Sequence, residues 1–202
     1  MRVLLADDHA IVRTGLRTVL LEEEGMDIVG EERDGARALE AVRALRPDIA
    51  VLDIEMPSLS GIDVARTVRD EGLPTAVLLL SMHREESFVD AALEAGVVAY
   101  VLKDDAPEEL IEAIHAIARR ELYLSRGLGP VRGNRNELSP RQRGIVRLLA
   151  KGLTSKEIAV DLDLSVKTVE GYRALIMDKL DLHSVAQLTK YAIRNALTTL
   201  DE

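Results

Sequence analysis

Acidic residues follow two of the short apolar runs in the first half of the sequence. Asp7 and Asp8 come directly after the run Val3–Ala6, and Asp53 ends the run that begins at Ile49. Carboxylates that are brought close together repel one another, and each disfavours ionisation of the others. A divalent cation relieves this repulsion, and an oxygen-only site that must also accept phosphate oxygens suits Mg²⁺. The spacing therefore indicates chemistry on a phosphate group.

A hydroxyl and a lysine end two further apolar runs. Ser81 closes the run that begins at Ala76, and Lys103 follows the run Val97–Leu102. Lys103 is the only lysine in residues 1–125, and a compact ammonium suits a point contact with a phosphoryl oxygen or a carboxylate. Together with the acids, these side chains supply what phosphoryl transfer to an aspartate requires: a nucleophilic carboxylate, metal ligands, a cation and a hydroxyl donor.

Alternating apolar runs and amphipathic stretches must position these side chains. Five strands alternating with five helices predict a parallel sheet with both faces covered. If the strand order is 2-1-3-4-5, the first and third strands are neighbours, and their acids meet at the edge where such sheets bind ligands. The predicted strands are Val3–Ala6, Ile28–Gly30, Ile49–Leu52, Ala76–Leu80 and Val97–Leu102, and the predicted helices are 10–22, 35–45, 60–70, 84–94 and 106–119.

The pattern changes after residue 119, which divides the chain into two domains. Residues 120–137 are rich in glycine and asparagine and carry little periodicity, which is typical of a linker. Residues 138–202 are predicted to form a small all-α domain of four helices, two of them joined by the tight turn at residues 163–165 as in a helix-turn-helix. Three capping-box pairs mark helix starts in this domain: Ser139 with Gln142, Thr154 with Glu157, and Ser184 with Gln187.

Composition excludes several classes of protein. The sequence has no cysteine, which excludes disulfides, thiolate catalysis and Cys-ligated metals, and its four histidines show no ligand spacing. Aromatic residues make up only 2% of the chain, which argues against a binder of single-stranded nucleic acid. No apolar run approaches the ~20 residues that span a bilayer and no signal peptide is visible, so we expect a cytoplasmic protein without membrane contact.

The net charge of −9 is divided unevenly along the chain. Residues 1–125 hold 13 basic and 26 acidic side chains, for a net −13, whereas residues 126–202 hold 13 and 9, for a net +4. An acidic first domain joined to a mildly basic second domain indicates two functions, the second facing an anion.

Several motifs carry a resemblance to a known family. Asp7–Asp8, Leu52–Pro57, Ser60–Gly61, Ser81, Ala95–Gly96 and Tyr100–Lys103 resemble the receiver domain of two-component response regulators. Leu138–Arg141, Gly152–Ala159, Lys167–Val169 and Lys179–Leu180 resemble the LuxR-type helix-turn-helix. Together they resemble the NarL/FixJ family over essentially the whole chain.

The resemblance implies a role for each residue of the acidic site. Asp53 is implied to be the phosphoacceptor, with Mg²⁺ as cofactor. The metal would be held by Asp8 and Asp53 directly, by Asp7 through water and by the backbone carbonyl of Glu55. Ser81 would hydrogen-bond the phosphoryl group, Lys103 would pair with it, and Tyr100 matches the aromatic that turns inward when the serine moves.

The resemblance also implies that the predicted helix Val166–Leu180 lies in the major groove of double-stranded DNA. Helical spacing turns Lys167, Glu170, Gly171 and Ala174 outward, with Arg173 at the flank. Phosphate contacts are expected from Thr154, Lys156, Thr168 and Lys179.

The function expected from these motifs is a transcription regulator controlled by phosphorylation, not an enzyme beyond slow self-phosphorylation and self-dephosphorylation. The expected partners are a histidine kinase, double-stranded DNA and, after phosphorylation, a second copy of the chain. One alternative is a constitutive DNA-binding protein that uses the first domain only as a scaffold. Another is a phosphohydrolase with an aspartyl-phosphate intermediate, although such enzymes place their acids as Asp-x-Asp rather than side by side.

Overall fold

Strands and helices alternate along the first half of the chain, as the apolar pattern predicts. The computed structural model describes residues 1–128 and 138–198. Two compact units are present, residues 1–84 with 91–128 and residues 85–90 with 129–202. The strands are β1 (Arg2–Ala6), β2 (Asp27–Glu32), β3 (Ile49–Asp53), β4 (Ala76–Ser81), β5 (Ala99–Leu102) and β6 (Tyr123–Leu124). The helices that alternate with them are α1 (Ala10–Glu22), α2 (Gly35–Leu45), α3 (Gly61–Asp70), α4 (Glu86–Glu94) and α5 (Ala106–Ala118).

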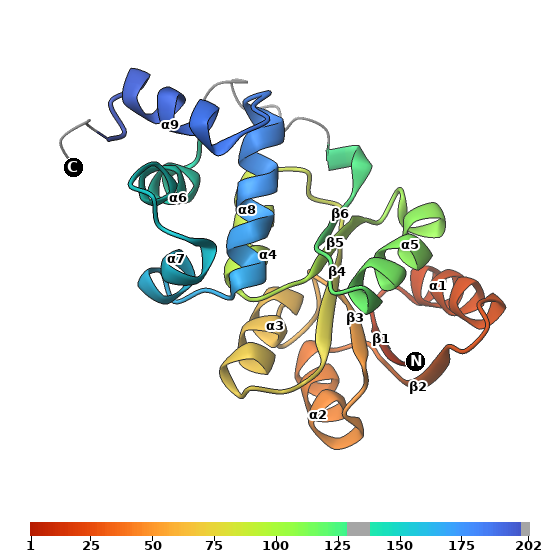
Figure 1. The fold of residues 1–202 in the computed structure, drawn as a ribbon. Helices are drawn as coiled ribbons and strands as arrows, with labels where there is room; N and C mark the ends of the chain where they lie inside the picture. Colours follow the sequence, from red (N-terminus) through yellow and green to blue (C-terminus); the bar gives the residue numbers. More distant parts are fainter. Residues whose placement is uncertain (129–137, 199–202) are drawn as a thin grey trace. The chain divides into compact units, whose positions relative to one another are not determined.

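The sheet has the order β2-β1-β3-β4-β5-β6 with every neighbouring pair parallel. The predicted order of the first five strands is therefore confirmed, and the strand order reverses between β1 and β3 (Figure 1). Successive strands can be parallel only when the chain crosses over between them, and the helices make these crossovers.

The core of the first unit lies against the four central strands, which are buried almost throughout. Alternate residues of a strand point to opposite faces, and one face, with Leu5, Val51, Leu80 and Val101, packs against α1 and α5. Figure 1 shows α2 and α3 covering the other face. Each fully buried Leu or Val contributes on the order of 1.5–3 kcal/mol to the stability of the fold. The core therefore holds the sheet edge that carries the acids rigidly in place.

Strand β6 is the element that the sequence did not predict. Its two residues add to the free edge of β5, with Ala99 opposite Tyr123 and Tyr100 opposite Leu124. A short 3₁₀ helix, η1 (Arg126–Leu128), follows it. The first unit thus continues to residue 128, nine residues beyond the predicted domain end, and the first part of the predicted linker belongs to the sheet. Residues 129–137 of the predicted linker lie outside the described residues.

Gly61 lies where α3 begins directly beside the end of β3. Its amide donates to the carbonyl of Ile54 at 2.9 Å, and a Cβ at this position would lie 2.2 Å from the carbonyl oxygen of Asp53. Only glycine therefore allows the helix start to approach the acidic residue this closely.

We expect Gly61→Ala to lower the free energy of unfolding by about 2 kcal/mol, because the backbone of Asp53 must shift to admit the methyl group. The matched control is Gly15→Ala in the middle of α1, where a Cβ would meet nothing within 4 Å. That change should stabilise the protein by roughly 0.5–1 kcal/mol. Urea unfolding followed by circular dichroism measures both, and equal effects at the two glycines would contradict the packing argument.

The second unit contains the four predicted helices of the C-terminal domain. They are α6 (Pro140–Ala150), α7 (Ser155–Asp161), α8 (Val166–Lys179) and α9 (Val185–Arg194). Val169, Tyr172 and Ile176 of α8 are fully buried, as their helical spacing predicts. The connection from α7 to α8 turns at Asp163, whose φ is +52°. The turn residues form the tight link that the sequence indicates for a helix-turn-helix.

Capping interactions fix where these helices start. The capping boxes predicted at Ser139 and Thr154 are both complete. At Ser184 only half of the predicted box forms, because the serine accepts the amide of Gln187 while the Gln187 side chain accepts the amide of His183 instead, at 2.7 Å. Ser165 caps α8 as predicted, accepting the amide of Thr168 at 3.0 Å.

Candidate functional site

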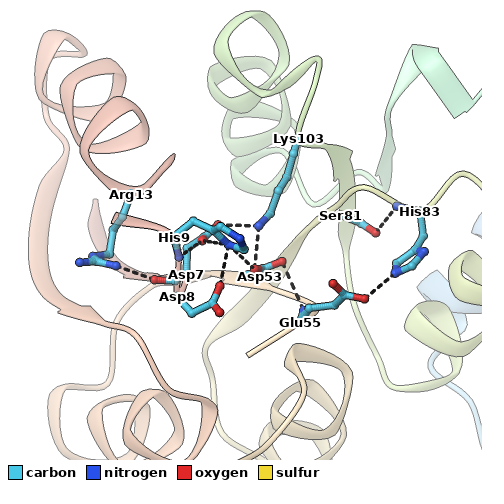
Figure 2. A network of polar contacts seen from close by, with 9 residues as sticks. All are labelled: Asp7, Asp8, His9, Arg13, Asp53, Glu55, Ser81, His83 and Lys103. Atoms are coloured by element: carbon cyan, nitrogen blue, oxygen red, sulfur yellow. Dashed lines mark hydrogen bonds and ion pairs between the residues drawn. The ribbon is translucent and has the colours of Figure 1, made fainter. Parts of the chain in front are cut away.

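The carboxyl ends of β1 and β3 bring two aspartates together. Ala6 lies opposite Leu52 in the sheet, so Asp7 and Asp53 leave neighbouring strands at the same edge. Asp7 is 0% and Asp53 2% exposed. Figure 2 shows their carboxylates facing the same space, with Asp8 on its open side. The convergence that the strand order predicts is therefore observed.

Lys103 reaches both buried aspartates from the end of β5. Its Nζ lies 2.9 Å from Oδ2 of Asp7 and 2.6 Å from Oδ2 of Asp53. Burial alone would lower the pKa of Lys103, but hydrogen bonds to Asp53 and Asp7 outweigh it, so the pKa lies above its ordinary value. The side chain is therefore a permanent ammonium that holds the two acids together.

Asp53 is held in an environment that disfavours its charge. Burial raises the pKa of Asp53 above the ordinary value of an aspartate, and the neighbouring Asp7 raises it further. The hydrogen bond from Lys103 opposes both effects without cancelling them. One ammonium thus neutralises this group of acids incompletely, and a second cation would favour the ionised form.

The donor atoms at this edge fit a divalent cation. One ligand atom from each of Asp7, Asp8, His9 and Asp53 lies within 4.8 Å of the others. The Oδ2 atoms of Asp7 and Asp53 are buried, and each lies at ion-pair distance from Nζ of Lys103. Their remaining lone pairs, together with the half-exposed carboxylate of Asp8, provide the oxygen ligands that hard cations prefer.

His9 belongs to this group although its spacing in the sequence gives no indication of it. Its Nδ1 lies 2.6 Å from Oδ1 of Asp8 and 3.4 Å from Oδ1 of Asp7, while 63% of the side chain is exposed. The available signal is its position directly after the two aspartates and directly before α1, which begins at Ala10. A residue there must share the loop that carries the acids.

Ser81 lies on the same rim and is almost fully buried. Its Oγ accepts the amide of His83 at 2.9 Å, and the imidazole of His83 lies 3.0 Å from the Glu55 carboxylate. The amide of Glu55 in turn donates to Oδ1 of Asp53 at 3.3 Å. Figure 2 shows this chain of contacts running from the acidic group to the loop after β4.

Tyr100 is fully buried in the middle of β5. Its hydroxyl donates to the carbonyl oxygen of His83 at 2.9 Å. The aromatic ring is thus already turned inward, and its hydroxyl is hydrogen-bonded to the loop that begins at Ser81. The predicted switch residue and the predicted phosphoryl contact are therefore linked through one residue, His83.

The predicted DNA-contacting residues fall into two groups. Lys167, Glu170 and Ala174 are exposed on α8 and Arg173 is half-buried, and Thr154 and Lys156 are exposed at the start of α7. Gly171 is buried, which corrects the prediction that it faces outward, and Thr168, predicted to contact a phosphate, is buried as well. Thr168 turns inward because its hydroxyl bonds to Ser165 at 2.7 Å, and Gly171, one turn later, lies on the same side of the helix.

Lys179 also differs from the expectation of a free surface cation. Its side chain is 7% exposed, and its Nζ lies 2.6 and 2.8 Å from the two carboxylate oxygens of Glu86, a residue of the same compact unit. In this arrangement the charge of Lys179 is neutralised within the chain.

Thr154 anchors the start of α7 and provides a further test. Hydrogen bonds from the amide and the hydroxyl of Thr154 lower the pKa of Glu157. Thr154→Ala removes the hydroxyl and the cap, so we expect the helical unit to lose about 1 kcal/mol of stability. We also expect the Glu157 pKa to rise toward its ordinary value, measured by an NMR titration.

The sign of the pH effect follows from that lowered pKa. The Glu157 interaction stabilises the folded unit above the ordinary pKa of about 4.5 and is lost as the pH falls through the lower folded value. Thr154→Ala should therefore flatten the stability profile in acid. Ser155→Ala, one residue on and outside the capping box, is the matched control, and an equal effect there would disprove the role of the cap.

Comparisons with known proteins cover both halves of the chain. Residues 3–115 match the family described as "Response regulator receiver domain", and residues 136–192 match "Bacterial regulatory proteins, luxR family". The chain belongs to the response regulators. It is 35% identical over 194 residues to the nitrate/nitrite response regulator protein NarL of Escherichia coli (strain K12), covering 90% of each chain.

Solved structures of similar proteins agree with this assignment. The signal receiver domain of the putative response regulator NarL from Mycobacterium tuberculosis has a TM-score of 0.57 and 42% identity, covering 58% of this response regulator and 95% of that chain. The two-component response regulator RcsB in its DNA complex has a TM-score of 0.60 and 28% identity, covering 95% and 96%.

This response regulator of the NarL/FixJ family thus joins a receiver domain to a LuxR-type DNA-binding domain and regulates transcription under the control of phosphorylation. None of its described helices combines the length and apolar composition needed to cross a bilayer.

Proposed function

We propose that Asp53 is the residue that accepts the phosphoryl group. The observation that carries this proposal is the shared position of its Oδ2, 2.6 Å from Nζ of Lys103 and within the group of acids that fits a cation. A carboxylate oxygen of Asp53 attacks the phosphorus, and the bond from phosphorus to the donor's nitrogen or oxygen breaks. Asp7 is buried at the sheet edge and Asp8 is half-exposed. Asp53 is therefore the acid that has both the proposed metal ion and the rim residues around it.

Mg²⁺ is the cofactor that these oxygen donors fit. Asp8 and Asp53 would bind it directly, Asp7 through a water, and the backbone carbonyl of Glu55 would complete the set. When bound, the metal neutralises negative charge on the phosphoryl oxygens and orients the group for in-line transfer. Lys103, whose Nζ lies 2.6 Å from Oδ2 of Asp53, would supply the second positive charge.

The phosphorylated site then changes the surrounding rim. A phosphoryl group on Asp53 carries up to two negative charges in place of the single charge of the carboxylate, together with three acceptor oxygens, which pair with Lys103 and attract the hydroxyl of Ser81. The loop that begins at Ser81 follows, since His83 is bonded both to Ser81 and to Tyr100. Shifting the rim from 1:99 to 99:1 in favour of its phosphorylated arrangement requires interactions that favour this arrangement by roughly 5.5 kcal/mol.

The partners follow from the two domains. A histidine kinase, or a small phosphodonor, supplies the phosphoryl group, and the phosphorylated receiver pairs with a second copy of the chain. A net charge of +4 in residues 126–202 neutralises few phosphates, so a single copy binds DNA weakly and two copies double the contacts. The exposed residues Lys167, Glu170, Arg173 and Ala174 of α8 would face the bases, with Thr154 and Lys156 on the phosphates.

The test uses the full-length protein and its Asp53→Ala variant. Acetyl phosphate with Mg²⁺ should add the mass of one phosphoryl group to the wild type only. Beryllofluoride with Mg²⁺ should convert the wild type to a dimer and raise its affinity at least tenfold for duplexes that it selects from a random-sequence pool. The variant should show none of the three responses.

The outcomes separate the alternatives. If both proteins bind the selected duplexes equally and without regard to beryllofluoride, the receiver is only a scaffold. Turnover of small phosphate esters by the wild type would instead identify a phosphohydrolase. Equal phosphoryl uptake by Asp53→Ala would show that another residue is the acceptor.

A further inference from the structure

Residues 123–128 attach the end of the receiver to the open edge of its own sheet. The amide of Tyr123 donates to the carbonyl of Val98 at 3.1 Å, and the amide of Ser125 donates to the carbonyl of Tyr100 at 2.8 Å. A strand of only two residues gains little from such a ladder. Other contacts must therefore hold this segment, and the structure shows where they lie.

A buried carboxylate on α5 provides the first anchor. Glu109 is only 5% exposed, and its two oxygens accept the hydroxyl of Ser125 at 2.5 Å and the amide of Arg126 at 3.1 Å. A buried charge is costly unless it is hydrogen-bonded. Releasing the segment would leave this carboxylate without both of these donors, unless water replaced them.

The second anchor is at Gly127, which is contacted by residues of two loops. Its carbonyl oxygen accepts Nη1 of Arg84 at 2.6 Å, and Nη2 of the same guanidinium pairs with Asp104 at 3.0 Å. A Cβ on Gly127 would lie 2.1 Å from Oδ2 of Asp105. The segment thus fits into a notch between the β4–α4 loop and the β5–α5 loop, and a side chain at Gly127 would displace the ends of the Asp105 and Arg84 side chains that form it.

Both loops that form the notch also carry residues of the phosphorylation site. Arg84 is three residues after Ser81 and follows His83, whose amide is bonded to the Ser81 hydroxyl. Asp104 and Asp105 directly follow Lys103. The contacts on Gly127 therefore depend on the positions of the same two loops that respond to a phosphoryl group.

We propose that residues 123–128 are a latch, closed on the sheet edge in the unphosphorylated receiver and released when Asp53 is phosphorylated. This rests on the proposed function, because the movement of Ser81 toward the phosphoryl group is what displaces His83 and Arg84. Arg84 then leaves Gly127, and the segment detaches from β5. Six released residues lengthen the covalent tether to the DNA-binding domain by at most roughly 20 Å.

Hydrogen–deuterium exchange of the full-length protein tests the latch. We expect beryllofluoride with Mg²⁺ to speed exchange at the amides of Tyr123, Ser125 and Leu128 at least fivefold, because each of them donates to a backbone carbonyl in the closed state. Peptides from β1 and β3 should stay protected. Asp53→Ala should show no change in residues 123–128.

Two substitutions should open the latch without activation. Gly127→Ala places a methyl group against Asp105, and Arg84→Ala removes both bonds of the guanidinium. Each should bring the exchange of residues 123–128 in untreated protein to within about twofold of the activated wild type. Arg119→Ala is the matched control, since it removes a surface arginine paired with Glu121 just before β6 and leaves the notch intact.

Each result supports or overturns the latch. Dimerisation by beryllofluoride with unchanged or slower exchange at residues 123–128 would overturn the latch and leave the proposed function standing. Fast exchange of these residues in untreated wild type would also overturn it, because the segment would then not be held. A wild type that gains no phosphoryl group and shows no response to beryllofluoride would overturn both proposals.

Discussion

Replacing Lys103 with methionine should slow the uptake of a phosphoryl group from acetyl phosphate by roughly 100-fold. Its ammonium lies 2.6 Å from the proposed acceptor and is one of the two positive charges at the site. Removing one such charge from a buried site that stabilises a developing negative charge typically costs a factor of about 10²–10³. Intact mass followed over time at saturating Mg²⁺ measures the rate.

The variant also tests whether the effect is local. Lys103→Met leaves Asp7 and Asp53 without their ammonium, so it should be less stable without metal and should regain much of that stability with Mg²⁺. Lys156→Met, which removes an exposed lysine of the DNA-binding domain, should take up phosphoryl groups at the wild-type rate. Wild-type uptake by Lys103→Met would show that the lysine is structural only.

We expect the removal of one exposed acid to eliminate most of the stabilisation that magnesium gives the receiver. A cation that binds only the folded protein adds about 2.7 kcal/mol to the free energy of unfolding when its concentration is 100 times its Kd. Asp8→Asn should remove most of this gain, because Asp8 is the acid on the open side of the group. Urea unfolding with Mg²⁺ or with a chelator measures it.

Asp8 is suited to this test because its loss should not unfold the protein. Its side chain is 36% exposed, and changes at such positions usually alter stability by less than about 1 kcal/mol. Asp27→Asn, an exposed acid at the start of β2, is the matched control and should keep the full effect of Mg²⁺. Equal stabilisation of the Asp8 and Asp27 variants would place the metal elsewhere.

The sheet and its site can be predicted because apolar runs and amphipathic stretches alternate regularly along the sequence, which indicates a parallel sheet. Asp7, Asp53 and Lys103 come from three strands, and the strand order alone brings them to one edge. The sequence alone therefore predicts the candidate site.

The features that the sequence does not predict depend on tertiary contacts and not on a hydrophobic pattern. Tyr123–Leu124 is too short to show a strand period, and its surroundings are rich in glycine, so nothing local indicates β6. Helical spacing alone predicts Gly171 to face outward, whereas the structure buries it on the side of α8 that also carries Thr168. His9 carries no ligand spacing, since its partners are its neighbours in the sequence and a residue from a distant strand.

The ion pair at the acidic edge has a chemical consequence for acetyl phosphate, which has two electrophilic atoms. An amine attacks its carbonyl carbon only as the free base, and the contacts of Lys103 with Asp53 and Asp7 keep its pKa above the ordinary value. We therefore expect acetyl phosphate to acetylate Lys103 more slowly than an exposed lysine, while the proposed acceptor Asp53 attacks the phosphorus.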